Sequence, residues 1–555
     1  MKTKATLGIA VAALSTAFVV GLLFAHSDLF ANRVVVDLDR KVRRLVSGVV
    51  PERPVPDRTV ASTFLRLHLQ TITVPVDRPG AGGGLTSVDD TLLLLTHEGA
   101  IWSMHGMSPQ RTRISAPDNN FAAYKAAGET GKYRHLKHAL EFFRYNDILH
   151  FEDAAGQYLI VSYTEWRPEL ECYGTALARL PLDLSEPDPA TMAAGPEEWE
   201  VFFRTEPCLP LKDTMRALEG HMAGGRIANA GRGKIILGSG DYHWDGLYAP
   251  KSLPQETDND YGKVLEIDVA TGEAQHLSIG NRNVQGIMVD RGGRVWAVEH
   301  GPRGGDELNL VQKGRNFGWP EATLGTRYNK LPWPTTAPYG RHDGFDAPIH
   351  AWLPSIGVSN LLQIEGFDAT WDGDFLVGSL KAGTLFRLRE TDGRILFAEP
   401  IEIGERIRYV HQHTDGRIVL WTDDGELVFV SKTAASQSFA YIEETIEKLQ
   451  LEPQRKAGLS TAIMACAECH SFEPDEHRDA PSLANLHGRR PGVTSFRGYS
   501  AALRSLGGAW TDERIASYLT DPHSHAPGTT MPDPNLPAET IADLVGLLRA
   551  VSAPE

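Results

Sequence analysis

Positive charge is in short supply in this chain of 555 residues, which has 55 lysines and arginines against 71 aspartates and glutamates, a net charge of −16. A nucleic-acid-binding protein needs a basic surface, so this balance argues against a nucleic-acid partner. The sequence also lacks compositional extremes: 42% of its residues are hydrophobic and 23% charged, which excludes a disordered or collagen-like chain. Cysteine is scarce: the chain has four cysteines, Cys172, Cys208, Cys466 and Cys469.

Turn-forming residues, by contrast, are plentiful. The 53 glycines and 34 prolines predict many tight turns, which fit a β architecture better than a helical bundle. At roughly 150 residues per domain, the length predicts one large domain and one small domain.

Short apolar runs recur between about residues 65 and 432. Each follows a turn with Gly or Asp and has four or five apolar residues, as expected for a strand. Their recurrence predicts the blades of a β-propeller over residues 60–433, although the irregular spacing does not fix the number of blades. The clearest runs begin at Asp90, Gly233, Gly293, Gly373 and Asp415.

The pattern changes after residue 433. Turns disappear over 434–452, where helical spacing predicts a linker helix. Residues 453–555 are expected to form a compact second domain with helices that start near Thr511 and Pro537. The predicted fold class is therefore mainly β, with an all-α C-terminal domain.

The N-terminus carries a hydrophobic stretch. Lys2 and Lys4 precede uncharged residues from Ala5 to Ala25. This uncharged stretch is longer than the hydrophobic region of a typical signal peptide and about as long as a membrane-spanning helix. We expect residues 1–28 to be an uncleaved membrane anchor or a cleaved signal peptide, and a buried soluble helix is the remaining alternative.

A motif for covalent haem attachment lies near the start of the second domain. In Cys466-Ala-Glu-Cys469-His470, the two thiols are expected to bind one haem c and the histidine to ligate its iron. A redox dithiol or half of a zinc site are the alternatives. Met531 is the predicted ligand on the other side of the iron, which suits an electron carrier. Its rivals are His477, His487, His523 and His525.

The haem motif also indicates the compartment, because haem is attached covalently outside the cytoplasm. We therefore expect the body of the chain to lie in the periplasm. Cys172 and Cys208 then form a possible disulfide with a structural role. Two unpaired buried thiols are the alternative.

Residues 455–555 resemble a small monohaem cytochrome c. The resemblance rests on the Cys-x-x-Cys-His motif, Ala480-Pro481, Tyr499, Trp510 and the loop that ends at Met531. In that family, the proline after the motif orients the histidine ligand through its carbonyl. The resemblance implies a haem-bearing electron-transfer domain.

A second group of polar residues lies within the predicted propeller. Arg282, Asn283 and Gln285 can direct several donors at a planar anionic group. Gly301 and Pro302 follow, and free carbonyls at this position suit a calcium ion. Turn formation alone is the alternative explanation for these glycines and prolines.

The full pattern resembles the soluble quinoprotein sugar dehydrogenases, which are six-bladed propellers that use pyrroloquinoline quinone (PQQ). Arg-Asn-x-Gln-Gly, His-Gly-Pro with Asp-Glu-x-Asn, and Asn-x-Gly-Trp-Pro occur here in that family's order. The resemblance covers residues 65–430 and is strongest after residue 220. Further matches are His221, Asp241, Lys381, Arg406 and Arg408.

The resemblance implies a role for each matched residue. His221 would be the catalytic base, although one extra residue separates it from the Gly-Gly-Arg that follows. Asp241 or Asp306 would orient its imidazole or stabilise the charged form. The cofactor-binding residues would be Arg282, Asn283, Gln285, Lys381, Arg406 and Arg408, with calcium at Gly301 and Pro302. We expect Glu307, Asn309 and Trp319 to be structural.

Two domains of these kinds predict a flow of electrons. A PQQ-dependent dehydrogenase would oxidise an aldose-type sugar or related alcohol and pass electrons through haem c to an external cytochrome or membrane oxidase. The membrane anchor would keep that acceptor close. The alternatives are a non-catalytic ligand-binding propeller with a cytochrome tail, and a haem sensor with an open iron. Poorly matched loops before residue 220 leave the substrate open.

Overall fold

The computed structural model describes residues 58–77, 80–129, 142–182, 191–211, 220–336, 338–432, 437–474, 477 and 479–552. The N-terminal segment predicted to be an anchor or signal peptide lies outside these residues. Within the described part of the chain, no helix combines the length and the apolar character needed to cross a membrane.

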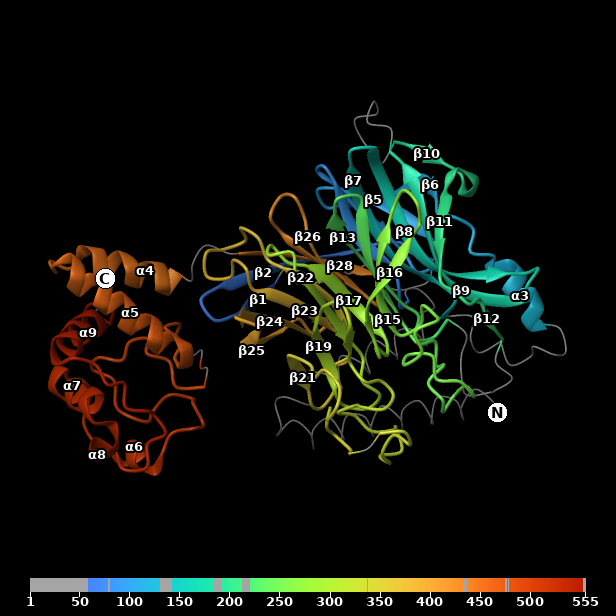
Figure 1. Ribbon diagram of the computed structural model, residues 1–555. Coiled ribbons are helices and arrows are strands. Elements are labelled where there is room, and N and C mark those ends of the chain that lie inside the picture. Colours follow the sequence, from blue (N-terminus) through green and yellow to red (C-terminus); the bar gives the residue numbers. More distant parts are fainter. Residues whose placement is uncertain are drawn as a thin grey trace, which may run out of the picture.

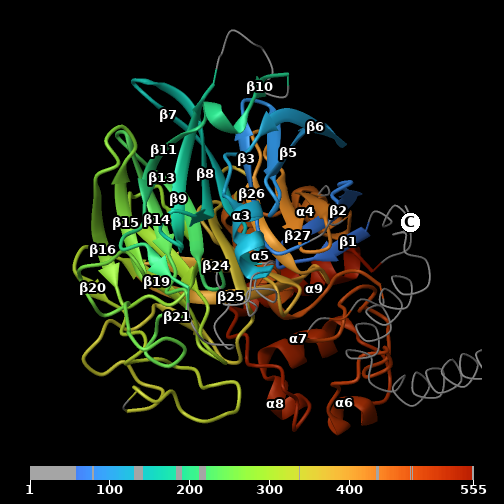
Figure 2. The same cartoon turned by 90° about the vertical axis from the view of Figure 1, so that its right-hand side faces the viewer.

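Six sheets, in which nearly all neighbouring strands are antiparallel, form the large domain (Figure 1). Their first strands, β3, β7, β13, β17, β22 and β26, contact one another in succession around a closed ring. The large domain is therefore a six-bladed β-propeller, as predicted. Figure 2 shows the blades from a second direction.

The first blade consists of β3 (Gly84–Val88), β4 (Thr91–Leu95), β5 (Ala100–His105), β6 (Ser108–Ser115) and β10 (Ala193–Ala194). The second consists of β7 (Tyr145–Asp153), β8 (Gly156–Arg167), β9 (Cys172–Pro181), β11 (Glu200–Arg204) and β12 (Leu209–Pro210). The third consists of β13 (Gly224–Gly231), β14 (Lys234–Ser239), β15 (Lys263–Asp268), β16 (Ala274–Ile279) and β20 (Arg315–Asn316). A helix, α3 (Phe121–Glu129), lies between the first two blades in the sequence.

The fourth blade consists of β17 (Val284–Val289), β18 (Val295–Glu299), β19 (Asp306–Val311) and β21 (His350–Trp352). The fifth consists of β22 (Val358–Gln363), β23 (Phe375–Ser379), β24 (Thr384–Thr391) and β25 (Arg394–Glu402). The sixth consists of β26 (Ile407–Gln412), β27 (Ile418–Thr422), β28 (Glu426–Lys432), β2 (Arg66–Thr73) and β1 (Arg58–Ala61). The N-terminal strand β2 thus completes the last blade beside β28 and closes the ring.

The apolar runs singled out in the sequence are the second strands of five blades: β4, β14, β18, β23 and β27. Every residue of β4, β23 and β27 is buried. Neighbouring blades cover both faces of such a strand, so it has no polar face and reads as a continuous apolar run.

The turn before β18 shows how such a strand begins. Oδ1 of Asp290 accepts the amides of Gly292 and Arg294 at 2.9 and 2.8 Å. Gly293 between them has φ +75°, which glycine adopts without strain. Oδ2 of the same aspartate accepts Nε1 of the buried Trp296 at 2.9 Å, which ties the turn to the core.

The C-terminal domain is helical, as predicted, and is coloured orange and red in Figure 1. Its helices are α4 (Gln437–Lys448), α5 (Pro453–Cys469), α6 (Ala501–Ser505), α7 (Asp512–Thr520), α8 (Pro522–His525) and α9 (Ala538–Ala550). The helix expected as a linker, α4, is more than that: Ile442 and Ile446 are buried in one core with Leu459, Ile463 and Leu544. Its apolar stripe therefore belongs to the second domain.

A disulfide joins Cys172, the first residue of β9, to Cys208, which directly precedes β12. This confirms the predicted pairing. The bond lies within the second blade and spans a sequence separation of 36 residues.

Replacing both cysteines, C172S/C208S, should lower the free energy of unfolding of the propeller by about 2–4 kcal/mol, because the cross-link restricts the unfolded chain. Thermal unfolding followed by calorimetry measures this change. A reducing agent should lower the melting temperature of the wild-type propeller and leave that of the double variant unchanged. Equal melting temperatures of the two oxidised proteins would contradict a stabilising role.

Candidate functional site

The polar residues predicted for the propeller lie at one end of its blades. In an antiparallel pair, the start of the first strand and the end of the second lie at the same edge. His221, Arg282 and Arg406 precede the first strands β13, β17 and β26. Asp241 and Lys381 follow the second strands β14 and β23. The topology therefore gathers segments distant in the sequence at one face of the ring.

His221 is held by other aromatic rings. Its Nδ1 is hydrogen-bonded to Nε2 of His243 at 3.0 Å, and its ring lies 4.5 Å from that of Phe142. Burial lowers the pKa of His221 well below 6.5, and the neighbouring His243 and Arg144 lower it further. The imidazole is therefore neutral at neutral pH and able to accept a proton.

Asp241 is fully buried and lies in a different network from the one expected. Its Oδ1 accepts the amide of His243 at 2.8 Å, and its Oδ2 accepts Nε1 of Trp319 at 2.7 Å. Burial raises the pKa of Asp241, and the nearby Asp245 raises it further. Trp319 thus holds the Asp241 carboxylate, and its purely structural role stays a prediction.

Asp306 likewise binds backbone amides rather than a side chain of the site. Its carboxylate accepts the amides of Gly301 at 3.1 Å and Gly357 at 2.6 Å, which joins the loops of two blades. The expected contact of Asp241 or Asp306 with the His221 imidazole is therefore not seen. Among the described residues, His243 makes that contact instead.

The backbone conformation accounts for this difference. Met222, one of the two residues between His221 and the Gly-Gly-Arg that follows, has φ +61°, and Tyr242 and His243 have φ +48° and +61°. Left-handed backbone is rare for residues other than glycine and clusters at functional sites. These conformations direct the loop after β14 so that the ring of His243, rather than the carboxylate of Asp241, faces His221.

Two buried arginines in this region keep donors without partners. Among the described residues, Nε of Arg144 and Nε of Arg282 are buried and make no hydrogen bond. Burial, followed by the charge of Arg408, lowers the pKa of Arg144 to about 9. Sequence analysis missed Arg144, which directly precedes β7 and matches no motif. Buried guanidinium groups that keep an unpaired N–H favour an anionic ligand.

The other predicted cations differ in their surroundings. Arg406 and Arg408 share one carboxylate, that of Asp423, at 3.0 and 2.7 Å. Lys381 is exposed. Arg144 and Arg282 lie in the same region, so the described site offers four guanidinium groups, whereas the carboxylates of Asp241 and Asp306 are used by neighbouring amides and by Trp319. The three carboxylates of PQQ fit this arrangement in charge.

Asn283 and Gln285 link two blades. Oδ1 of Asn283 accepts Nε2 of Gln285 at 3.0 Å and the amide of Gly224 at 3.2 Å. Nδ2 of Asn283 lies 3.3 Å from Nδ1 of His300. These side chains hold the loop that carries Arg282 against the strand that follows His221.

One of the two carbonyls predicted for calcium, that of Gly301, accepts a hydrogen bond from an arginine in this structure. Nη1 of Arg282 donates to the carbonyls of His300 and Gly301 at 3.0 and 3.1 Å. Over the described residues, no group of three or more His, Cys, Asp or Glu is placed to hold a metal ion. Calcium at Gly301 and Pro302 stays a prediction, and no step below depends on it.

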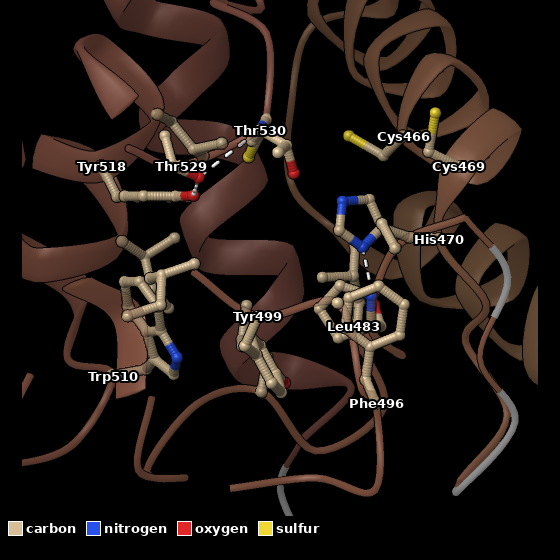
Figure 3. Close-up of a pocket in the computed structure, with 18 of the residues that line it drawn as sticks. Cys466, Cys469, His470, Leu483, Phe496, Tyr499, Trp510, Tyr518, Thr529 and Thr530 are labelled. Carbon is tan, nitrogen blue, oxygen red and sulfur yellow. Dashed lines mark hydrogen bonds between the residues drawn. The ribbon is translucent and has the colours of Figure 1, made fainter. Parts of the chain in front are cut away.

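The C-terminal domain contains a cavity of about 360 Å³ (Figure 3). Cys466, Cys469 and His470 line it beside apolar residues from α7 and α9 and aromatic residues such as Tyr499 and Trp510. Burial raises the pKa of the Cys466 thiol to about 11. A redox dithiol needs a lowered pKa, so this environment favours haem attachment over that alternative.

His470 is oriented for metal binding through one nitrogen. Its Nδ1 lies 2.7 Å from the carbonyl of Pro481, which fixes the hydrogen on Nδ1 and leaves Nε2 as the free ligand atom. This is the contact that the cytochrome c resemblance predicts. Figure 3 shows the ring of His470 at the cavity beside the two cysteines.

Met531 lines the same cavity, whereas the four rival histidines are absent from its described lining. His487 binds Asp512 at 3.0 Å, and His477 and His525 bind serine hydroxyls at 2.8 and 3.1 Å. The donor set of two thiols, one histidine and one thioether around an apolar cavity therefore fits haem c.

Comparison with known proteins agrees with this geometry. The family model described as Glucose / Sorbosone dehydrogenase matches residues 147–429, just over half of the chain. The aldose sugar dehydrogenase YliI of Escherichia coli is 31% identical over 235 residues, which cover 38% of this chain and 60% of that protein. The match to another curated relative covers 37% of that protein's length.

Two further similarities concern the separate domains. Cytochrome c of Guizotia abyssinica is 36% identical over 100 residues, which cover 18% of this chain and 90% of that protein. A crystal structure of glucose dehydrogenase covers 66% of this chain and all of its own, with 25% identity and a TM-score of 0.50. The chain therefore belongs to the glucose/sorbosone dehydrogenase family and combines it with a region homologous to cytochrome c.

Proposed function

We propose that this chain is a periplasmic PQQ-dependent dehydrogenase that oxidises an aldose-type sugar and passes the electrons through its own haem c to an external acceptor. One observation carries the proposal: His221, whose neutral form burial favours, lies near Arg144 and Arg282, two buried arginines that each keep an unpaired Nε. Such a site combines a base with positions for an anionic cofactor. The name of the E. coli relative supports an aldose as the substrate class.

The propeller residues divide the chemistry among them. When bound, PQQ supplies a two-electron acceptor for the hydride of the substrate. Arg144, Arg282 and Arg408 would hold its carboxylates and oxygens through charge-assisted hydrogen bonds. His221 would take the proton of the hydroxyl that is oxidised, because its imidazole is kept neutral by burial.

The C-terminal domain would complete the path. When bound, haem c supplies a one-electron carrier. Cys466 and Cys469 would hold it covalently, and His470 and Met531 would ligate its iron. The Cys172–Cys208 disulfide supports the periplasm, since disulfides persist in oxidising compartments. The N-terminal hydrophobic stretch would keep the chain near a membrane acceptor.

The deciding experiment follows the haem spectrum of the full-length, oxidised, haem-loaded protein. We expect reduction only when PQQ and a sugar from a panel of aldoses are both present. Tight PQQ binding without reduction would mean that the substrate lies outside the panel. Absence of PQQ binding, with a haem that dithionite still reduces, would overturn the enzyme and favour a ligand-binding propeller.

His221→Gln should reduce kcat by about 100-fold or more while PQQ binding stays within about threefold, because a general base contributes 10²–10⁴ in rate. Steady-state kinetics with an artificial electron acceptor and a PQQ titration measure both effects. His276→Gln is a matched control, since its ring binds Asp260 at 3.0 Å outside the site. An H221Q variant with near-normal kcat would exclude His221 as the base.

Arg144→Met should weaken PQQ binding by about 10- to 100-fold, because a hydrogen bond to a charged group contributes about 1.5–3 kcal/mol. Methionine retains most of the apolar contact and removes the charge. Fluorescence or calorimetric titration of the apoprotein with PQQ measures the dissociation constant. An unchanged constant would remove Arg144 from the cofactor site.

C466A/C469A should abolish covalent haem and leave dye-linked sugar oxidation within about twofold, since the two domains have separate cores. Reduction of an external cytochrome should be lost. Haem staining after denaturing electrophoresis and the two activity assays check these outcomes. Retained cytochrome reduction without haem would show that electrons leave the propeller directly.

A further inference from the structure

The loop after β14 carries two side chains, His243 and Asp245, that connect to His221 and that no part of the proposed mechanism uses. Nε2 of His243 is hydrogen-bonded to Nδ1 of His221 at 3.0 Å. On its other side, Nδ1 of His243 lies 3.9 Å from Oδ2 of Asp245. The three residues therefore form a line from a buried carboxylate to the predicted base.

Backbone amides hold the carboxylate of Asp245 in place. Asp245 is fully buried, and its Oδ1 accepts the amides of Leu247 and Tyr248, both at 2.9 Å. Within the described residues, its Oδ2 accepts no hydrogen bond. Because the two amides hold Oδ1, they also determine which oxygen faces His243.

The loop is held in an unusual conformation around His243. Its φ is +61°, and its amide donates to Asp241 at 2.8 Å. Its ring also packs against Tyr248, with ring centres 4.9 Å apart. A left-handed conformation is unfavourable for a residue other than glycine, so the fold maintains this orientation against a local preference.

The positions of the three groups select one arrangement of hydrogens. A carboxylate beside Nδ1 of His243 favours the hydrogen on that nitrogen, which leaves Nε2 of His243 as an acceptor. His221 must then donate from its Nδ1. In a neutral imidazole only one nitrogen carries hydrogen, so Nε2 of His221 keeps its lone pair.

We propose that His243 and Asp245 are positioning residues that hold His221 in its Nδ1–H tautomer, with Nε2 free to accept the substrate proton. This inference rests on the proposed function of His221 as the base. In the step itself, the O–H bond of the substrate breaks and an N–H bond forms at Nε2. The hydride leaves to the bound two-electron acceptor, and the imidazolium keeps its Nδ1–H bond to His243.

Asp245→Asn tests the proposal because the amide should reverse the tautomers. The Leu247 and Tyr248 amides require an oxygen, so they hold Oδ1 of the asparagine and place its NH₂ group toward Nδ1 of His243. His243 would then carry hydrogen on Nε2 and donate to His221, whose own hydrogen would move to Nε2. The base would be blocked without loss of the turn.

We expect kcat of D245N to fall about 100-fold or more while KM stays within about threefold, as for a base in the wrong tautomer. Asp268→Asn is the matched control, since Oδ1 of Asp268 accepts two turn amides at 3.0 and 2.9 Å on an exposed loop. It should keep wild-type kcat. A D245N variant with the kcat of D268N would overturn the proposal.

A second readout needs neither cofactor nor sugar. Long-range ¹H–¹⁵N spectra of the full-length protein with ¹⁵N-labelled histidine report each tautomer, and the H221Q spectrum identifies the His221 signals. We expect Nδ1–H in the wild type and Nε2–H in D245N. An Nε2–H tautomer in the wild type would overturn the inference, whereas loss of sugar oxidation in the wild type alone would overturn only the proposed function.

A pair of His243 variants guards against misfolding of D245N. His243→Gln keeps an acceptor oxygen near the position of Nε2, whereas His243→Phe retains the ring and removes the acceptor. We expect kcat of H243Q to exceed that of H243F by about tenfold or more. Equal kcat values for the two variants would show that His243 acts only through packing and would overturn the proposal.

Discussion

One buried guanidinium joins most of the propeller. Arg226, from the third blade, donates to carbonyls at the inner edges of four other blades, those of Gly83 and Asn146 at 2.8 Å, Gln285 at 3.0 Å and Arg408 at 3.2 Å. Its charge is balanced by Asp147 at 3.8 Å. A buried charge is tolerated only when its donors are satisfied, so these carbonyls must converge for the ring to be stable. The closed arrangement of first strands therefore depends on this side chain.

The same convergence shapes the chemistry of the site. The residues whose carbonyls Arg226 holds are near neighbours of Arg144, Asn283 and Arg406 in the sequence, so the site is fixed where the inner strands meet. Burial there favours uncharged forms, lowering the pKa of His221 and raising that of Asp241. The neutral base and the unpaired Nε atoms of Arg144 and Arg282 thus have one origin, which is removal from water at the centre of the ring.

Sequence reasoning succeeded where the signal is local. The second strands are continuous apolar runs because both of their faces are covered, and Cys466, Cys469 and His470 form a contiguous motif. It failed where the information lies in tertiary packing. Nothing around Arg144 indicates that its strand begins beside His221, and the left-handed backbone at His243 follows from contacts that the sequence does not display. The amphipathic pattern of the segment that forms α4 predicted a helix. It did not indicate which domain's hydrophobic core would bury that helix.

Closure of the last blade has a consequence for how the chain folds. β2 pairs with β28 so that Leu67 lies opposite Lys432, with nearly the whole propeller between them in the sequence. Such a contact forms only after the entropy of closing a very long loop has been overcome. During synthesis, the edge of β2 that later pairs with β28 is unpaired, and the ring remains open. Strand β2 is therefore synthesised early and is among the last strands to find its place.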